Sequence, residues 1–144
     1  MVYTELTKKA LRISFDAHKD QVDKTGLPYI FHPFHLAEQM DTEDEVIVAL
    51  LHDVVEDTNI TPDDLKTHGF SECVMDALVV LTHDDGTEYM DYIRKIKSNT
   101  LAVKIKLADL RHNSDVTRLD AVDEKISERL EKYRTAIEYL EKEE

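Results

Sequence analysis

Apolar residues recur at helical spacing along almost the whole chain. Leu6, Ala10, Ile13 and Ala17 follow one another at intervals of three or four residues, which places them on one face of an α-helix. We find no convincing series of strands, because the short apolar runs continue at helical spacing on both sides. The pattern therefore predicts an all-α protein, with helices at about 6–17, 32–40, 42–53, 61–69, 71–81, 87–97, 101–112 and 123–140.

Several predicted helices have recognisable starts. Thr42 followed by Glu45 is typical of a capping box, and Thr61-Pro62 is typical of an N-cap followed by the first helical residue. Thr87 is a candidate N-cap for a later helix. The three glycines and three prolines fall at the breaks between helices, and no linker is long enough to divide the chain. We therefore expect one helical domain over residues 1–144.

The charge and composition exclude some classes of partner. A formal net charge of −13 repels nucleic acid and anionic membranes. No apolar run approaches the roughly 20 residues that cross a bilayer, and the N-terminus lacks the apolar segment of a signal peptide. Cys73 is the single cysteine and, on an apolar helix, is expected in the core. We expect a cytoplasmic protein with no nucleic-acid or membrane partner; the sequence leaves its oligomeric state open.

A His-Asp pair interrupts an apolar helical stretch, ALLHDVVEDT, at residues 49–58. A carboxylate buried there costs several kcal/mol unless it is paired or bound to a metal. His52 and Glu56 lie four residues apart, as do Asp53 and Asp57, so one continuous helix would place them on adjoining turns. Taken alone, the pair also fits a solvated polar stripe or a buried salt bridge.

Two further polar residues occur in apolar surroundings. His32 stands in GLPYIFHP, and Asp109 stands in the helical run KIKLADLRHN. Two histidines and two aspartates at polar breaks in apolar helices are harder to explain as unrelated surface residues. Such a mixed nitrogen and oxygen set suits Mn²⁺, Fe²⁺ or Zn²⁺, and the absence of cysteine argues against a purely structural zinc site.

The order of these motifs resembles a known superfamily. The succession H…HD…D is the pattern of HD phosphohydrolases. More specifically, AHKDQ-x-x-K-x-G-x-PYI-x-HP, ALLHDVVEDT and IKLAD-x-x-HN resemble the hydrolase domain of RelA/SpoT-type alarmone enzymes and their small stand-alone relatives. The resemblance runs from about Ala17 to about Asn113 and implies a single-domain helical bundle of the HD-domain type that binds one Mn²⁺.

The resemblance also implies roles for particular residues. The metal ligands of that family match His32, His52, Asp53 and Asp109. The acidic pair that assists the attacking water matches Glu56 and Asp57, and the nucleotide-binding residues match Lys24 and Asn113.

The nucleotide-binding positions depart from the family pattern. The family has Arg-Lys where this chain has Asp23-Lys24, and Asp115 stands near the position of a further expected basic residue. A carboxylate in place of an arginine changes substrate preference, because it repels phosphate where a guanidinium would bind it. We therefore expect Asp23 to disfavour guanosine tetraphosphate relative to less phosphorylated nucleotides.

The sequence thus predicts a metal-dependent phosphohydrolase that acts on a small phosphorylated substrate, a nucleotide of the (p)ppGpp type or a related phosphate or pyrophosphate ester. One alternative is a non-catalytic sensor that keeps the metal and nucleotide sites without turnover. The other is a helical interaction domain in which the same residues form a buried polar network. A metal assay separates this last alternative from the first two.

Overall fold

The computed structural model describes residues 1–142, so the last two residues of the predicted domain lie outside it. Within this range the secondary structure is helical, apart from one isolated bridge between Val22 and Pro28. The all-α prediction is confirmed. The helices are α1 Glu5–His18, α2 Phe31–Glu38, α3 Glu43–Leu51, α4 Val54–Asp57, α5 Pro62–Lys66, α6 Glu72–Leu81, α7 Tyr89–Lys97, α8 Thr100–Asn113 and α9 Glu124–Glu141, with a short 3₁₀ turn η1 at Val116–Arg118.

The helix starts agree with the capping signals at two sites. Thr42 and Glu45 form the expected capping box, and Thr61 caps α5 with Pro62 as its first residue. The prediction for α7 is wrong by one residue, because Glu88, and not Thr87, accepts the hydrogen bond from the amide of Asp91. A carboxylate satisfies a free amide at a helix N-terminus as well as a hydroxyl does.

One predicted helix is interrupted at the motif that carries the chemistry. The helix expected through Asp53 ends at Leu51, and a separate turn, α4, begins at Val54. Asp53 has φ −104° and ψ −3°, in the bridge region between the helical and extended conformations. No glycine or proline marks this break. The pair His52-Asp53 therefore lies in a bend between two helices.

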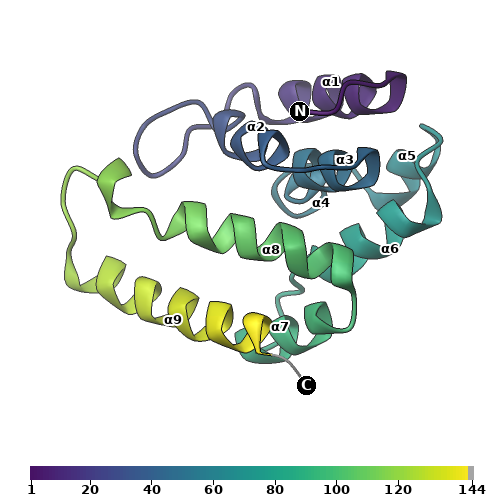
Figure 1. Cartoon of the computed structure of the whole chain (residues 1–144). Helices are drawn as coiled ribbons and strands as arrows, with labels where there is room; N and C mark the ends of the chain where they lie inside the picture. The colour runs from purple at the N-terminus through teal and green to yellow at the C-terminus, as the bar shows by residue number, and fades with distance from the viewer. Residues whose placement is uncertain (143–144) are drawn as a thin grey trace.

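Helix α3 forms the centre of the fold. Every residue from Val46 to Leu51 is buried, because α1, α2, α6 and α8 all pack against this helix. Helix α8 runs between α2 and α3 on one side and α9 on the other (Figure 1). Its buried side includes Ile105 and Leu110, together with the charged Asp109. The histidines and aspartates of the sequence motifs thus lie where α2, α3 and α8 meet.

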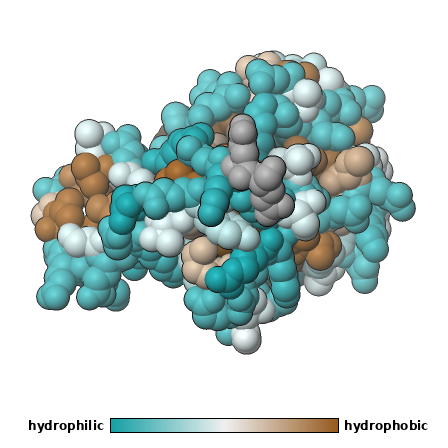
Figure 2. Space-filling view, turned by 60° about the horizontal axis from the view of Figure 1, so that its bottom comes forward, coloured by the Kyte–Doolittle hydropathy of each residue, from teal (hydrophilic) through white to brown (hydrophobic). Residues whose placement is uncertain are grey.

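The surface carries exposed apolar side chains at one end. Figure 2 shows them gathered at the left, the end at which Figure 1 places the connection between α8 and α9. Val116 and Val122, in that connection, are exposed. Cys73 is exposed as well, so its prediction as a core residue is wrong: it lies on the outer side of α6, whose buried side is formed by residues such as Val74 and Leu78. None of the described helices is both long and apolar enough to cross a membrane.

Candidate metal centre and its cavity

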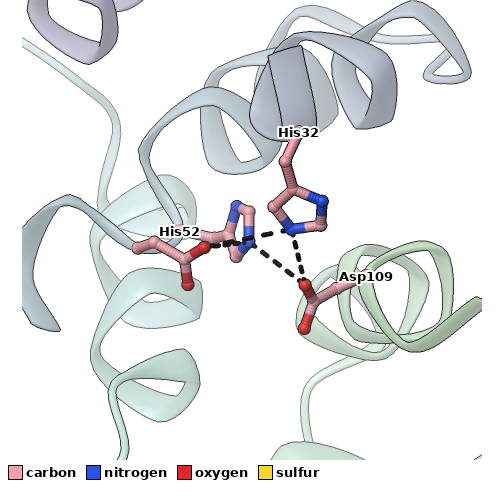
Figure 3. A group of neighbouring side chains, drawn as sticks. His32, His52 and Asp109 are labelled. Carbon is pink, nitrogen blue, oxygen red and sulfur yellow. Dashed lines mark hydrogen bonds and ion pairs between the residues drawn. The ribbon is translucent and has the colours of Figure 1, made fainter. Parts of the chain in front are cut away.

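The structure brings together four of the residues that the sequence singles out. His32 lies in the first turn of α2, His52 and Asp53 lie in the bend between α3 and α4, and Asp109 lies on α8. One potential ligand atom from each lies within 4.8 Å of all the others. Figure 3 shows His32, His52 and Asp109 pointing toward one another from different segments. The two histidines and Asp109 are buried, and Asp53 is partly buried.

His32 is held at both ring nitrogens. Its Nε2 lies 2.8 Å from Oδ1 of Asp109, and its Nδ1 lies 2.7 Å from Nδ1 of His112. Burial, and then the neighbouring His32 and Arg118, lower the pKa of His112 to about 4, so His112 is neutral at pH 7. A neutral His112 can accept a hydrogen bond at Nδ1 from the Nδ1–H of His32, which leaves Nε2 of His32 free to bind a cation.

His52 is oriented by the backbone. Its Nδ1 lies 2.7 Å from the carbonyl oxygen of Ala49, which can only accept, so Nδ1 carries the proton. Its Nε2 is buried and has no well-aligned hydrogen bond, although Oδ2 of Asp53 lies at 2.9 Å and Oδ1 of Asp109 at 3.5 Å. A ring nitrogen that faces two carboxylates favours a positive charge between them, either a proton on the nitrogen or a bound cation.

The electrostatics of the cluster favour a bound cation. Burial opposes charge on His52, but Asp53 and Asp109 outweigh it and raise the pKa of His52 well above its usual value. Burial opposes ionisation of Asp109 as well, yet Lys106 and the two histidines hold its pKa well below the usual range. Two ionised carboxylates and two imidazole nitrogens therefore share a site that attracts positive charge. This donor set fits a divalent metal ion.

Neighbouring side chains fix the two carboxylates. The hydroxyl of Tyr29 donates to Oδ2 of Asp53. Lys106 Nζ donates to Oδ2 of Asp109 at 2.9 Å, and Asn113 Nδ2 donates to Oδ1 of Asp109 at 3.1 Å. Partners of this kind hold ligands in one orientation and are needed for tight metal binding. Asn113, predicted to contact the nucleotide, is thus also a direct partner of a candidate ligand.

The two predicted catalytic acids line a cavity of about 250 Å³ that opens beside the cluster. Glu56 is fixed there, because its Oε1 accepts a hydrogen bond of 2.7 Å from the backbone amide of His83. Desolvation, followed by the negative charges of Asp53 and Glu56, raises the pKa of Asp57 to about 6. Asp57 can therefore exchange a proton close to neutral pH. Glu56 is the acid whose side chain is held in one orientation, by the amide of His83.

A second cavity, of about 300 Å³, adjoins the first and shares Tyr29, Asn113 and Tyr133 with it. Lys24, the other predicted nucleotide-binding residue, lines this second cavity. Burial and the positive charges of nearby side chains, Arg129 first among them, lower the pKa of Lys24. The wall also carries Asp23 and Asp115, but Asp23 is paired with Arg118, so Lys24 is the basic group here that suits an anionic ligand.

Sequence reasoning missed three residues of this region. Arg118 lines the second cavity, but it lies in the irregular segment after α8, where no motif indicates its position. His112 and Tyr133 were not singled out either. For His112 a signal was present, since it precedes Asn113 within the motif. Lys106, on α8, lies beside Asp109 at the smaller cavity.

No protein-family model matches the sequence. The guanosine-3′,5′-bis(diphosphate) 3′-pyrophosphohydrolase of Haemophilus influenzae is 36% identical over 115 residues, covering 70% of this chain and 17% of that protein. The protein of the same name from Vibrio cholerae is 42% identical over 73 residues, covering 45% and 10%. The bifunctional (p)ppGpp synthase/hydrolase SpoT of Escherichia coli is 31% identical over 121 residues, covering 74% and 17%. The chain thus spans 10–17% of the length of these relatives.

The helical arrangement itself also recurs in a solved structure. A protein described as a metazoan ortholog of SpoT that hydrolyses ppGpp matches with a TM-score of 0.80 and 22% identity, covering 98% of this chain and 88% of that one. This likeness confirms the predicted all-α fold of the HD type. The sequence matches confirm the family resemblance: the homologues of this chain are SpoT/RelA-type (p)ppGpp hydrolases.

Proposed function

We propose that residues 1–144 form one metal-dependent phosphohydrolase domain that removes pyrophosphate from a guanosine 3′,5′-bis(diphosphate)-type nucleotide. The observation that carries this proposal is the cluster of His32, His52, Asp53 and Asp109 beside a cavity that also holds Glu56 and Asp57. The names of the relatives, most of them 3′-pyrophosphohydrolases, support this substrate.

His32, His52, Asp53 and Asp109 would hold the metal ion, and we propose Mn²⁺, which accepts imidazole and carboxylate together. A divalent cation supplies Lewis-acid chemistry here: it lowers the pKa of water and polarises a phosphoryl oxygen. The proposal uses only the donor set and charge of the site. Zn²⁺ and Fe²⁺ suit the same donors, so metal preference is a separate measurement.

The chain's own groups would orient and deprotonate the water. Glu56, held by the amide of His83, is placed to orient a water molecule in the smaller cavity. Asp57, with a pKa of about 6, is mostly ionised at pH 7 and can take the proton that the water loses on attacking phosphorus. The nucleotide's 3′ oxygen and pyrophosphate separate as the bond between them breaks. The same Asp57 can return the proton to the leaving oxygen.

The basic groups at the cavities would bind the phosphates. Lys132 lines the smaller cavity and Lys24 the larger one, and Asn113 lines both. Lysine binds phosphate as a point charge, and an amide can donate to a phosphate or base oxygen. The larger cavity, bounded by Tyr29 and Tyr133, is the proposed site of the nucleoside. Glu56 and Asp57 favour turnover over the alternative of a non-catalytic sensor.

A product assay tests the proposal. Purified protein with Mn²⁺ is incubated with a nucleotide panel that includes guanosine tetraphosphate, and pyrophosphate and phosphate release are measured. We expect release of pyrophosphate that stops on chelation and is absent in His52→Ala. Binding of the tetraphosphate with no product from any nucleotide would replace the hydrolase by the sensor. If the protein neither binds nor hydrolyses any nucleotide and retains no metal, the result would favour the alternative of a helical interaction domain.

A further inference from the structure

The exposed side of α1 carries a stripe of charge in an unusual order. Lys8, Arg12, Asp16 and Asp20 follow at intervals of four residues, so they lie in a row along one side of the helix and just past its C-cap, Lys19. All four are exposed. Among the described residues none of them takes part in an ion pair. The row therefore reads two positive charges followed by two negative ones.

This order is unfavourable for an isolated helix. The helix macrodipole favours acidic groups near the N-terminus and basic groups near the C-terminus, as Glu5 and His18 have it, whereas the stripe has the reverse order. Lys8 and Arg12 are like charges four residues apart within α1, and such a pair destabilises a helix. Arg12 and Asp16 are opposite charges four residues apart, a spacing that can support an isolated helix, but among the described residues they form no ion pair. Both groups are therefore available to a charged group outside the helix.

An apolar groove lies beside the stripe. It has a volume of about 460 Å³ and lies between α1 and the start of α2. Phe15 on α1 and Phe31 on α2 are 53% and 56% exposed, although both are large apolar side chains. Arg12 and Asp16, the middle members of the stripe, also line this groove. Helix α1 forms an edge of the molecule, at the top of Figure 1, so a partner can reach it.

We infer that this face binds a second copy of the chain, with the two α1 helices antiparallel across a twofold axis. In that arrangement Arg12 of each copy faces Asp16 of the other, and Lys8 faces Asp20. Each contact occurs twice, as an isologous interface requires. Because the positive charges lie at one end of the stripe and the negative charges at the other, two antiparallel copies bring opposite charges together at every contact. The exposed phenylalanines supply the apolar centre of the interface.

The local charge of the α1 stripe, and not the charge of the whole chain, favours a second copy at this face. Two chains of net charge −13 repel each other overall. On the α1 stripe the two positive and two negative charges cancel, so this face adds no repulsion of its own to that of the two chains. The complementary contacts then set the register, as charge pairs do at helix interfaces.

Sedimentation equilibrium of the full chain, at concentrations up to about 10⁻⁴ M, tests the inference. We expect the wild type to approach twice the 16.7 kDa mass of one chain. Arg12→Glu and Asp16→Lys each create two like-charge contacts in the dimer and should raise Kd at least about tenfold. Lys95→Glu changes the same charge on an exposed position of α7 and should leave Kd unchanged. Circular dichroism checks that each variant is folded.

Recombining the variants tests the register itself. Arg12→Glu/Asp16→Lys in one chain exchanges the two charges and should restore the dimer. A mixture of the two single variants should form a heterodimer, because every contact between them is then attractive. A monomeric wild type at the highest concentration overturns the inference. So does a dimer that the single variants do not weaken, or one that neither recombination restores. None of these readouts depends on hydrolysis of a nucleotide.

Discussion

Asp23 and Arg118 form an ion pair across 95 positions of sequence, with 3.1 Å between Oδ2 and Nη2. The other carboxylate oxygen of Asp23 accepts hydrogen bonds from the amides of Thr25 and Leu27. Arg118 also donates to the carbonyl oxygen of His112. The pair thus joins the loop before α2 to the segment after α8. The expectation that Asp23 repels phosphate did not include this ion pair, in which Arg118 compensates the charge of the carboxylate.

We therefore predict that Asp23→Arg will not improve hydrolysis of guanosine tetraphosphate selectively. The substitution would place two guanidinium groups together and remove three acceptor contacts of the loop. We expect a loss of about 1–2 kcal/mol in the free energy of unfolding. Urea denaturation and steady-state kinetics on two nucleotides measure both effects, with Asp85→Asn as an exposed control. A selective rise in kcat/KM for the tetraphosphate, with stability unchanged, would restore the earlier hypothesis.

The pKa of Asp23 gives this prediction a pH dependence. Burial alone would raise the pKa, but the hydrogen bonds from Thr25 and Leu27 and the charge of Arg118 lower it below the usual value. A lowered pKa in the folded state stabilises the protein above the unfolded pKa, and the effect is lost as pH falls through the folded value. The difference in stability between wild type and Asp23→Asn should therefore be full at about pH 7 and shrink below about pH 4.

Asp23 and Arg118 also show where sequence reasoning stops. Helix periodicity needs only local spacing, so His32, His52 and Asp109 could be picked out as polar residues in apolar runs, and the family resemblance of their motifs then implied that they are ligands. The partner of Asp23 depends on how two irregular segments fold against each other, which spacing does not encode. The break at His52 escaped prediction for a similar reason. No glycine or proline marks it, so the bend is set by packing around α3.

Removal of a proposed ligand should release the metal. His52→Ala removes a nitrogen whose lone pair faces two carboxylates, and Asp53→Ala removes half of the anionic charge of the cluster. After gentle dialysis we expect about one equivalent of metal in the wild type and far less in either variant. His68→Ala, a histidine away from the cluster, is the control. Full metal retention by both ligand variants would exclude the proposed set.

His112 should tune metal affinity without being a ligand. Its Nδ1 lies 2.7 Å from Nδ1 of His32, and a neutral ring in this place fixes the tautomer that leaves Nε2 of His32 free. We predict that His112→Ala weakens metal binding by about 10–100-fold, the usual effect of losing such a partner. Competition with a chelator of known affinity measures the change. At saturating metal most of the activity should return; activity that stays low despite a full metal load would assign His112 a direct role in the reaction.

The turnover rates of two variants should show which of Glu56 and Asp57 acts as the base. Glu56→Gln keeps the size of the side chain, and its carbonyl can still accept from the amide of His83, but it loses the negative charge. We expect metal content to survive in Glu56→Gln and in Asp57→Asn, while kcat falls by about 10²–10⁴-fold in whichever variant lacks the base. Elemental analysis and initial rates, run on the same preparations, give both numbers. Unchanged rates in both variants would remove the pair from the proposed mechanism.

Asp57 should also destabilise the metal-free protein at neutral pH. Desolvation and the charges of Asp53 and Glu56 raise its pKa to about 6, so the folded state disfavours the ionised form. As pH rises from the unfolded pKa of about 4 through the folded value, the unfolded chain has released its proton and the folded one has not, so stability falls.

The substitution Asp57→Asn removes this effect. Since the side chain is partly solvated, we expect a gain of only about 1 kcal/mol in the free energy of unfolding at about pH 8, vanishing near pH 4. Urea denaturation in chelator at both pH values measures it, against Asp85→Asn. A stabilised variant that is inactive would show that Asp57 is retained for the reaction at the expense of the fold; a variant less stable than wild type at pH 8 would contradict the raised pKa.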